Sequence, residues 1–198
     1  SCGSESDNLA IIGAAHAAAR SGRHVITTAI EHPGVSEAFA HLKEEGYEVT
    51  VLPVDRYGRV DPSDLEAAVR DDTTLVSVMH VNNEIGSIEP VEELSAVIKR
   101  RNPSALFHVD AVQSFGKLRI SPKRMGIDLL SASGHKIHGP KGVGVLYARR
   151  GVRLLNVIEG GAPLSNGLAD FPQLFDEMYV NMVIAGEQSG EFAGILKL

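Results

Sequence analysis

A lysine follows a predicted strand within a run of small residues, Ser131-Ala-Ser-Gly-His-Lys136, and several glycines surround it. If this lysine is buried, its pKa falls and its free amine becomes a nucleophile for a carbonyl group. The alternative is a surface lysine in a glycine-rich hairpin. Spacing alone favours that alternative, because glycine-rich loops that contain lysines are common.

His108 and Asp110 lie two residues apart in a predicted strand, so their side chains point to the same face. A carboxylate at the end of a buried strand needs a cationic partner, and a protonated pyridine nitrogen is one such partner. A pyridine ring held in this way stays protonated and accepts electrons from a carbanion. The alternative is equally good: Asp110 caps a helix that begins at Ala111.

Small and hydroxyl residues at 1–8 stand directly before a predicted helix. Free backbone N–H groups at a helix start can bind an anion, and Ser4 could add a hydroxyl group. Simple N-capping is the commoner role of such residues. His32 also precedes a predicted helix, where its ring could stack on a flat ligand or cap the turn.

Short β-branched runs alternate with helical patterns along the first 150 residues. Helices are expected at 8–20, 33–45, from 61 onward and 90–101, and strands at 24–29, 48–53, 74–80, 105–110, 128–132 and 144–149. This alternation predicts an α/β fold, with a mostly parallel sheet and helices on both of its faces. Beyond residue 150 the pattern weakens, with a strand expected at 154–158 and a segment of uncertain type at 171–184.

Polar side chains follow four of the predicted strands, where each strand ends. In such sheets, ligands bind beyond the carboxyl ends of the strands. We therefore expect one pocket that gathers His32, Asn82, Asn83, Asp110, Gln113, Ser133, His135 and Lys136.

Composition excludes several classes of protein. The chain has 198 residues, 43% of them hydrophobic, and a net charge of −6, so it is globular and a poor nucleic-acid binder. No run approaches the roughly 18–20 apolar residues that a membrane span needs, so no membrane partner is expected. The single cysteine, Cys2, excludes an internal disulfide and a thiolate metal cluster. No secretory signal opens the chain, which makes the cytoplasm the expected location.

The order of the motifs resembles that of class V aminotransferases, and within them the cysteine desulfurase and selenocysteine lyase branch. The matching motifs, found between residues 1 and 149, are Gly3-Ser-Glu-Ser-Asp-Asn8, Glu31-His32-Pro33, His80-Val-Asn-Asn-Glu-Ile-Gly86, His108-Val-Asp-Ala-Val-Gln113 and Ser133-Gly-His-Lys136. The resemblance implies pyridoxal 5′-phosphate (PLP) as cofactor and the large domain of fold-type I PLP enzymes. It implies a PLP-binding core over 1–150 and a divergent tail over 151–198.

The resemblance also implies a role for each matching residue. Lys136 would bind PLP covalently and carry a proton, and Asp110 would pair with the pyridine nitrogen. Gln113 would hydrogen-bond the phenolic oxygen of the ring. His32 would stack on the ring and shuttle protons, and Asn83 would lie near the ring oxygen and the substrate carboxylate.

Further residues would hold the phosphate group of the cofactor. They are the backbone of Gly3 and the side chains of Ser4, Ser133 and His135, with His108 standing behind Asp110. Metal ligands are not expected.

The implied activity is removal of sulfur from L-cysteine, which leaves alanine and a persulfide on a cysteine of the enzyme. Implied partners are L-cysteine or a related amino acid, a sulfur-acceptor protein in iron–sulfur cluster biogenesis, and a second copy in a homodimer. No cysteine follows Lys136 and no arginine follows Arg153. We therefore expect a fragment that lacks the downstream catalytic cysteine. The alternatives are another class V enzyme, such as a selenocysteine lyase or an aminotransferase-like protein, and a non-catalytic PLP-fold fragment.

Overall fold

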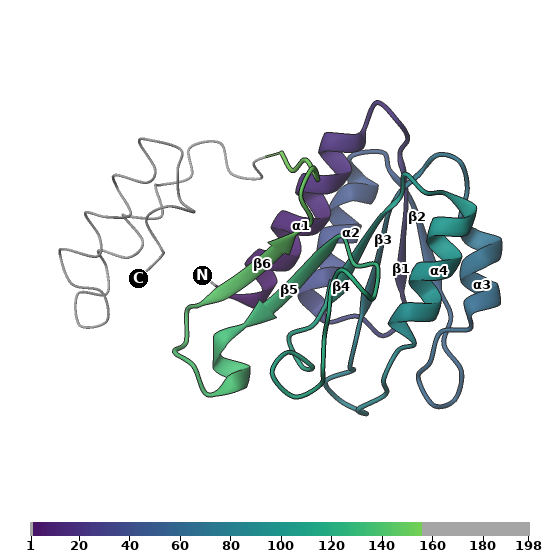
Figure 1. Ribbon diagram of the computed structural model, residues 1–198. Coiled ribbons are helices and arrows are strands. Elements are labelled where there is room, and N and C mark those ends of the chain that lie inside the picture. Colours follow the sequence, from purple (N-terminus) through teal and green to yellow (C-terminus); the bar gives the residue numbers. More distant parts are fainter. Residues whose placement is uncertain (1, 156–198) are drawn as a thin grey trace, which may run out of the picture. The chain divides into compact units, whose positions relative to one another are not determined.

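Six strands form one sheet in the order β2-β1-β3-β4-β5-β6 (Figure 1). The computed structural model describes residues 2–155, so the segment expected at 171–184, most of that at 154–158 and most of the tail at 151–198 lie outside the described residues. The strands are β1 (His24–Thr28), β2 (Glu48–Leu52), β3 (Thr73–Met79), β4 (Leu106–Asp110), β5 (Leu129–Ser133) and β6 (Gly144–Ala148). The first five run parallel, and β6 pairs antiparallel with β5.

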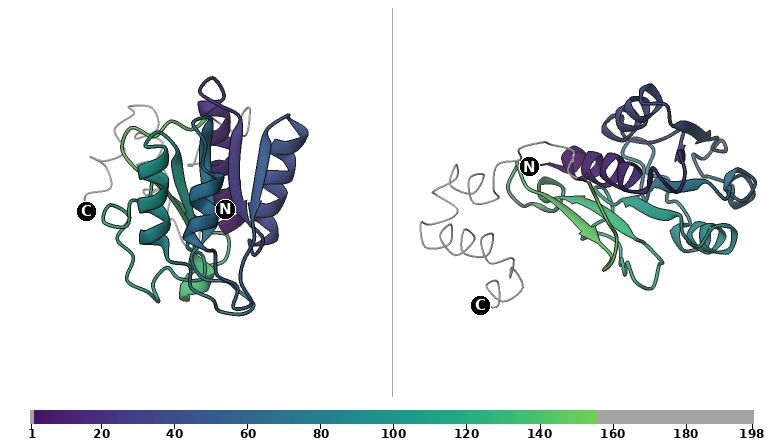
Figure 2. Two further views of the ribbon diagram at one scale, coloured as in Figure 1. Left: turned by 90° about the vertical axis from the view of Figure 1, so that its right-hand side faces the viewer. Right: turned by 90° about the horizontal axis from the view of Figure 1, so that it is seen from above.

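Helices cover both faces of this sheet, as expected for an α/β fold (Figure 2). They are α1 (Gly3–Ala18), α2 (Pro33–Glu44), α3 (Pro62–Ala68) and α4 (Val91–Arg101), with a short 3₁₀ helix, η1 (Gly134–Ile137), after β5. The apolar sides of α1 and α2 pack in one cluster with Val25 and Leu75, and those of α3 and α4 pack in another with Val76 and Phe107. Successive side chains of a strand point to opposite faces, so a strand buried on both faces is apolar throughout.

Helix α1 begins at Gly3, earlier than the predicted start at Asn8. Cys2 is its N-cap residue, with extended backbone angles, and the N–H of Ser6 donates to the carbonyl oxygen of Cys2. The polar first turns carry no apolar period, and Gly3, Ser6 and Asp7 are nonetheless buried there. The periodic pattern therefore placed the start too late, and the glycine and hydroxyl residues belong to the helix itself.

No helix begins at Ala111, contrary to the helix-capping interpretation of Asp110. Residues 112–117 form successive turns. The carboxylate oxygen Oδ1 of Asp110 accepts a hydrogen bond from the N–H of Val112, 2.8 Å away, and so stabilises a turn.

Asp128, directly before β5, connects three elements of the fold. Its side chain is 3% exposed. Oδ2 accepts hydrogen bonds from Nζ of Lys99 at 2.7 Å and from the N–H of Phe107 at 2.9 Å, and Oδ1 accepts one from Nε of Arg149 at 2.6 Å. The nearby cations and the N–H of Phe107 outweigh burial and hold the pKa of Asp128 below its usual value. The ionised side chain therefore connects α4, β4 and the end of β6.

Replacing Asp128 with alanine should lower the free energy of unfolding by about 3 kcal/mol, because the N–H of Phe107 loses its partner and two cations lose theirs. Urea unfolding at neutral pH measures the change. The control is Glu92→Gln, which breaks an exposed pair with Arg124 and should change stability by less than about 1 kcal/mol. Equal losses in the two variants would contradict the structural role of Asp128.

Candidate active site

A pocket at the carboxyl ends of β1, β3 and β4 gathers most of the predicted site residues. It is lined by Gly3, Ser4, Asp7, His32, Met79, Asn83, Asp110, Val112 and Gln113. Met79 and Asp110 end adjacent parallel strands and are register partners. The segments that follow these strands therefore leave the sheet side by side and supply Asn83 and Gln113 to one hollow.

The start of α1 forms one wall of this pocket. A Cβ atom at Gly3 would lie 2.8 Å from Cγ2 of Val112 and 3.4 Å from Cβ of Ser133. Only glycine allows the helix to approach the ends of β4 and β5 so closely. Ser4 lies against the start of α2, because a Cβ atom at Gly34 would lie 2.9 Å from Oγ of Ser4. The N-terminal ends of two helices thus meet beside the pocket, an arrangement that favours a bound anion.

His32 both caps a helix and lines the pocket. Its Nδ1 accepts a hydrogen bond from the N–H of Gly34, 3.1 Å away, at the start of α2. The bond engages Nδ1 and leaves Nε2 free of that contact. The capping interpretation is therefore correct, and the same side chain is one of the residues around the hollow.

Glu31 and Asn82 hold the segments on which His32 and Asn83 stand. The sequence analysis gave Glu31 no role and expected Asn82 in the pocket, but Asn82 is not among the residues that line it. Oε1 of Glu31 accepts hydrogen bonds from Oγ1 of Thr28 at 2.7 Å and from the N–H of Met79 at 2.9 Å. Nδ2 of Asn82 donates to the carbonyl oxygen of Ile30 at 2.9 Å. The segment after β1 is thereby tied to the segment after β3.

Asn82 also shapes its own loop, since its Oδ1 accepts hydrogen bonds from the N–H groups of Glu84 and Ile85. Both Glu31 and Asn82 belong to motifs that the sequence already singled out. The sequence pointed to chemical roles for their neighbours His32 and Asn83 but not for these two, because a side chain that only holds a loop has no chemical signature in the sequence.

His108 lies behind Asp110 in a fully buried polar cluster. Its Nδ1 hydrogen-bonds with Oγ of Ser77 at 2.8 Å, and its Nε2 with Oγ of Ser131 at 2.9 Å. Burial lowers the pKa of His108 to about 3, so the imidazole is neutral. Oδ1 of Asp7 approaches Nε2 of His108 to 3.7 Å. At neutral pH, His108 therefore supplies no positive charge to the acids around it.

Two acids, Asp7 and Asp110, line the pocket, and their charges act on a third acid, Glu31. Burial raises the pKa of Asp110, although the N–H of Val112 and the charge of His32 oppose the effect. Burial, and then the charge of Asp110, raise the pKa of Asp7 to about 8. Burial raises the pKa of Glu31 to about 8 as well. A cation beside Asp110 would relieve the unfavourable crowding of these carboxylates.

The remaining predicted residues end β5 or follow it, and they are not among the residues that line the pocket. Oγ of Ser133 hydrogen-bonds with Nδ1 of His135 at 2.7 Å. Lys136 is half-buried in η1, within the glycine-rich connection of the antiparallel β5–β6 hairpin. Ser133 nevertheless adjoins the start of α1, through its contact with the position that a Cβ atom at Gly3 would take.

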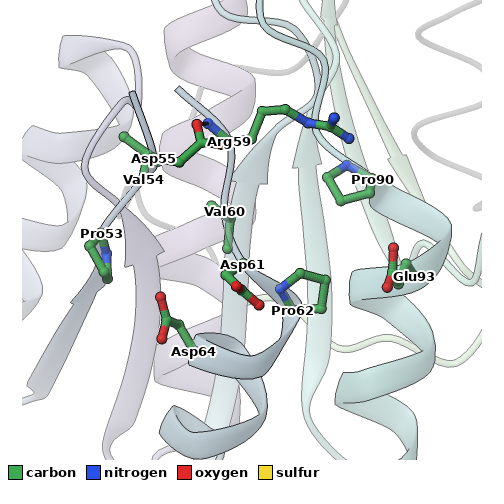
Figure 3. Close-up of a pocket in the computed structure, with 10 residues that line it drawn as sticks. All are labelled: Pro53, Val54, Asp55, Arg59, Val60, Asp61, Pro62, Asp64, Pro90 and Glu93. Carbon is green, nitrogen blue, oxygen red and sulfur yellow. Dashed lines mark hydrogen bonds between the residues drawn. The ribbon is translucent and has the colours of Figure 1, made fainter. Parts of the chain in front are cut away.

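A larger hollow lies away from these residues, between the segment after β2 and the starts of α3 and α4 (Figure 3). Its wall includes Asp55, Asp61, Asp64 and Glu93, with Arg59 as its only basic residue. Asp55 accepts hydrogen bonds from the N–H groups of Tyr57 and Arg59, and Asp61 caps α3. These two carboxylates therefore stabilise the local backbone.

No helix within residues 2–155 has the length and apolar character to cross a bilayer. The same part of the chain contains no cluster of three or more histidine, cysteine, aspartate or glutamate side chains arranged to hold a metal ion.

The parallel sheet, with its polar pocket at the carboxyl edge and a lysine after β5, defines the large domain of a fold-type I PLP-dependent enzyme. The family model "Aminotransferase class-V" matches residues 1–167. The chain belongs to the class V aminotransferase family, whose cysteine desulfurase members are PLP enzymes.

Curated relatives carry the name of a desulfurase. The chain is 49% identical over 164 residues to "Cysteine desulfurase IscS" of Dictyoglomus turgidum, an alignment that covers 83% of this chain and 41% of the relative. It is 43% identical over 196 residues to "Cysteine desulfurase IscS 1" of Archaeoglobus fulgidus, covering 98% of this chain and 50% of the relative. This second alignment extends well beyond residue 150, into the segment expected to diverge.

Solved structures show the same fold. A protein titled "NIFS-LIKE PROTEIN" matches with a TM-score of 0.78 and 44% identity, over 81% of this chain and 44% of that one. A structure titled "SspA in complex with cysteine" matches with a TM-score of 0.76 and 41% identity, over 81% and 46% of the two chains.

The chain spans half or less of the length of these curated relatives. The comparisons support a cysteine desulfurase-like protein, but they do not support the expected loss of the catalytic cysteine. Only part of each relative is represented in these 198 residues, so the absence of a cysteine after Lys136 is no evidence of such a loss.

The stability of the cofactor-free chain should fall as the pH rises from about 6 to 8. Asp7 and Glu31 keep their protons in the folded state up to a pH of about 8, whereas carboxyl groups of an unfolded chain ionise near pH 4. The folded state then binds more protons than the unfolded state, and each such proton contributes a slope of at most about 1.4 kcal/mol per pH unit.

Urea unfolding of the wild type and of Asp7→Asn across this range measures the effect. The difference between the two proteins removes the contributions of all titratable groups that the substitution leaves unchanged. We expect a shallower decline in Asp7→Asn. Parallel curves would show that Asp7 does not hold a proton in the folded chain.

Proposed function

We propose that this chain forms the cofactor-binding part of a PLP-dependent cysteine desulfurase, with L-cysteine as substrate. One observation carries the proposal: a single pocket has helix N-termini at one wall and the buried carboxyl of Asp110 at another. PLP carries an anionic phosphate and a basic ring nitrogen, so its two ends match these two groups. The names of the relatives support the substrate, as does the solved relative whose title places cysteine in complex with it.

The residues present fit the cofactor. The carboxyl of Asp110 would pair with the ring nitrogen, since its acidic surroundings lack a permanent cation and favour a protonated partner. The N–H groups of Gly3 and Ser4, together with Ser133 and His135, would hold the phosphate. The cofactor, when bound, supplies an electron sink for a carbanion at Cα of an amino acid.

The other residues would orient the ligands and move protons. Gln113 would donate to the phenolic oxygen of the ring. His32 would lie over the ring face, where Nδ1 is already engaged by Gly34 and only Nε2 is free to carry a proton. Asn83, exposed beside the pocket, would position the substrate carboxylate.

Lys136 would be the covalent attachment point for PLP and the base of the reaction. Its Nζ would remove the proton from Cα of the substrate and later return a proton, because an amine near its reacting carbon acts as both base and acid. The half-buried position of Lys136 supports this role, as it limits contact with water without removing the side chain from the surface.

The product and partners follow from the same proposal. Sulfur would pass as a persulfide to a cysteine and from there to an acceptor protein in iron–sulfur cluster biogenesis, in a cytoplasmic homodimer. We do not assign the persulfide to Cys2. Its position, directly before α1, would put a thiolate beside the cofactor's phosphate, where like charges oppose its formation.

Purified chain mixed with PLP should show the visible absorption band of PLP bound covalently to a lysine. The band should be lost in Lys136→Ala, because no other amine occupies the end of β5. The matched control is Lys141→Ala, which removes an exposed lysine from the same glycine-rich connection and should leave the band unchanged. Identical spectra for the wild type and Lys136→Ala would contradict the assignment.

Addition of L-cysteine tests the substrate. We expect L-cysteine to change the band of the PLP-loaded wild type at concentrations at which L-alanine does not. A stronger response to L-selenocysteine would favour the selenocysteine lyase branch. A band that responds to neither L-cysteine nor L-selenocysteine would contradict the proposed substrate class.

A further inference from the structure

Two buried carboxyl groups beside Asp110 have no part in the chemistry proposed above. Asp7 is 1% exposed, lines the pocket from α1, and its Oδ1 has no hydrogen-bond partner. Glu31 uses Oε1 to hold the segments after β1 and β3, but its buried Oε2 has no partner either. Buried carboxylate oxygens are normally hydrogen-bonded, so two such atoms at one site require an explanation.

The charged groups that face these acids offer little compensation. Asp7 faces Asp110 and, at 3.7 Å, the neutral His108 of β4; the hydroxyl of Ser131 lowers the pKa of Asp7 but does not outweigh burial and the charge of Asp110. Glu31 faces both Asp110 and Asp7. His32 acts on Asp110 from the start of α2. Neither lysine nor arginine occurs among the residues that line the pocket.

Carboxyl groups that face one another away from water cannot all ionise, because each negative charge opposes the next. They share protons and titrate as a unit. A cation placed beside one of them reduces this penalty for the whole group. The cluster therefore has a higher affinity for a proton, or for a cationic group, than an isolated carboxylate in the same place.

We propose that Asp7 is a positioning residue that acts through Asp110: with Glu31, its buried carboxyl makes this end of the pocket hold a protonated ring nitrogen more tightly than Asp110 alone would. This inference rests on the proposed function, because it takes the ring nitrogen of PLP as the ligand of Asp110. It adds that binding of the ring nitrogen by Asp110 depends on two further acids: Asp7 from α1 and Glu31 from the segment after β1.

The first test follows the carboxyl carbons by NMR in the cofactor-free chain. In the wild type, we expect Asp7 and Asp110 to titrate together, well above the usual range of aspartate. Asp7→Asn should move the midpoint of Asp110 downward by about one pH unit or more, because a neighbouring negative charge is removed. A purely structural role for Asp7 would leave that midpoint unchanged.

The matched control is Glu89→Gln. Glu89 is also a buried acid with a raised pKa and an unpartnered oxygen, but it holds the N–H of Val60, outside the pocket. This variant should leave the midpoint of Asp110 in place. An unchanged Asp110 in Asp7→Asn, or an equal shift in both variants, would overturn the proposal.

If Asp7→Asn does not fold, titration of Asp7 and Asp110 in the wild type still tests the proposal. Titration of both Asp7 and Asp110 in the usual range of aspartate would overturn the proposal without any variant. Glu31→Gln is the second variant, and it should lower the midpoint of Asp110 in the same direction.

The second test uses PLP labelled with ¹⁵N in its ring, whose chemical shift reports protonation. The ring nitrogen should keep its proton to a higher pH in the wild type than in Asp7→Asn, and an equal pH dependence in the two would overturn the proposal. If PLP does not bind to the wild type, the proposed function fails, while the carboxyl titrations of the cofactor-free chain still decide the role of Asp7.

Discussion

The parallel hydrogen bonding of β1, β3 and β4 decides where the chemistry of this domain can occur. In parallel strands, all carboxyl ends reach the same edge, and Met79 and Asp110 end side by side as register partners. The segments that leave this edge carry His32, Asn83 and Gln113. The pocket is thus a consequence of strand direction, and its residues come from separate parts of the chain.

The same edge concentrates acids that the fold does not neutralise. Asp128, at the other end of the sheet, contrasts with them, because two cations and a backbone N–H hold its carboxylate. At the pocket, Asp7 and Asp110 lie beside the neutral His108, and their charges also act on Glu31. Such an arrangement lowers the stability of the free chain above the ordinary pKa of a carboxyl group, and it is tolerated where a ligand supplies the missing positive charge.

Membership of the class V aminotransferase family and the geometry of the pocket support each other. The family accounts for the cofactor, and the structure gives physical reasons why a flat, basic ring with an anionic tail fits. Gly3 allows α1 to reach the ends of β4 and β5, and Asp110 lines the same pocket. Glu31 and Asn82 hold the intervening loops, so these loops are organised before any ligand arrives.

The sequence by itself determined the alternation of strands and helices, the parallel sheet and the motifs at its carboxyl edge, because those features rest on local periodicity and on short-range caps. It misplaced the start of α1, whose first turns are polar because they face a pocket, and it left open whether Asp110 caps a helix. Only the tertiary structure decided that Asp7, from the first helix, lies against His108 and Asp110 of a strand some hundred residues later in the chain. It also placed Lys136 in the hairpin connection after β5, outside the set of residues that line the pocket. Proximity of this kind depends on how the helices pack on the sheet, and no local pattern encodes it.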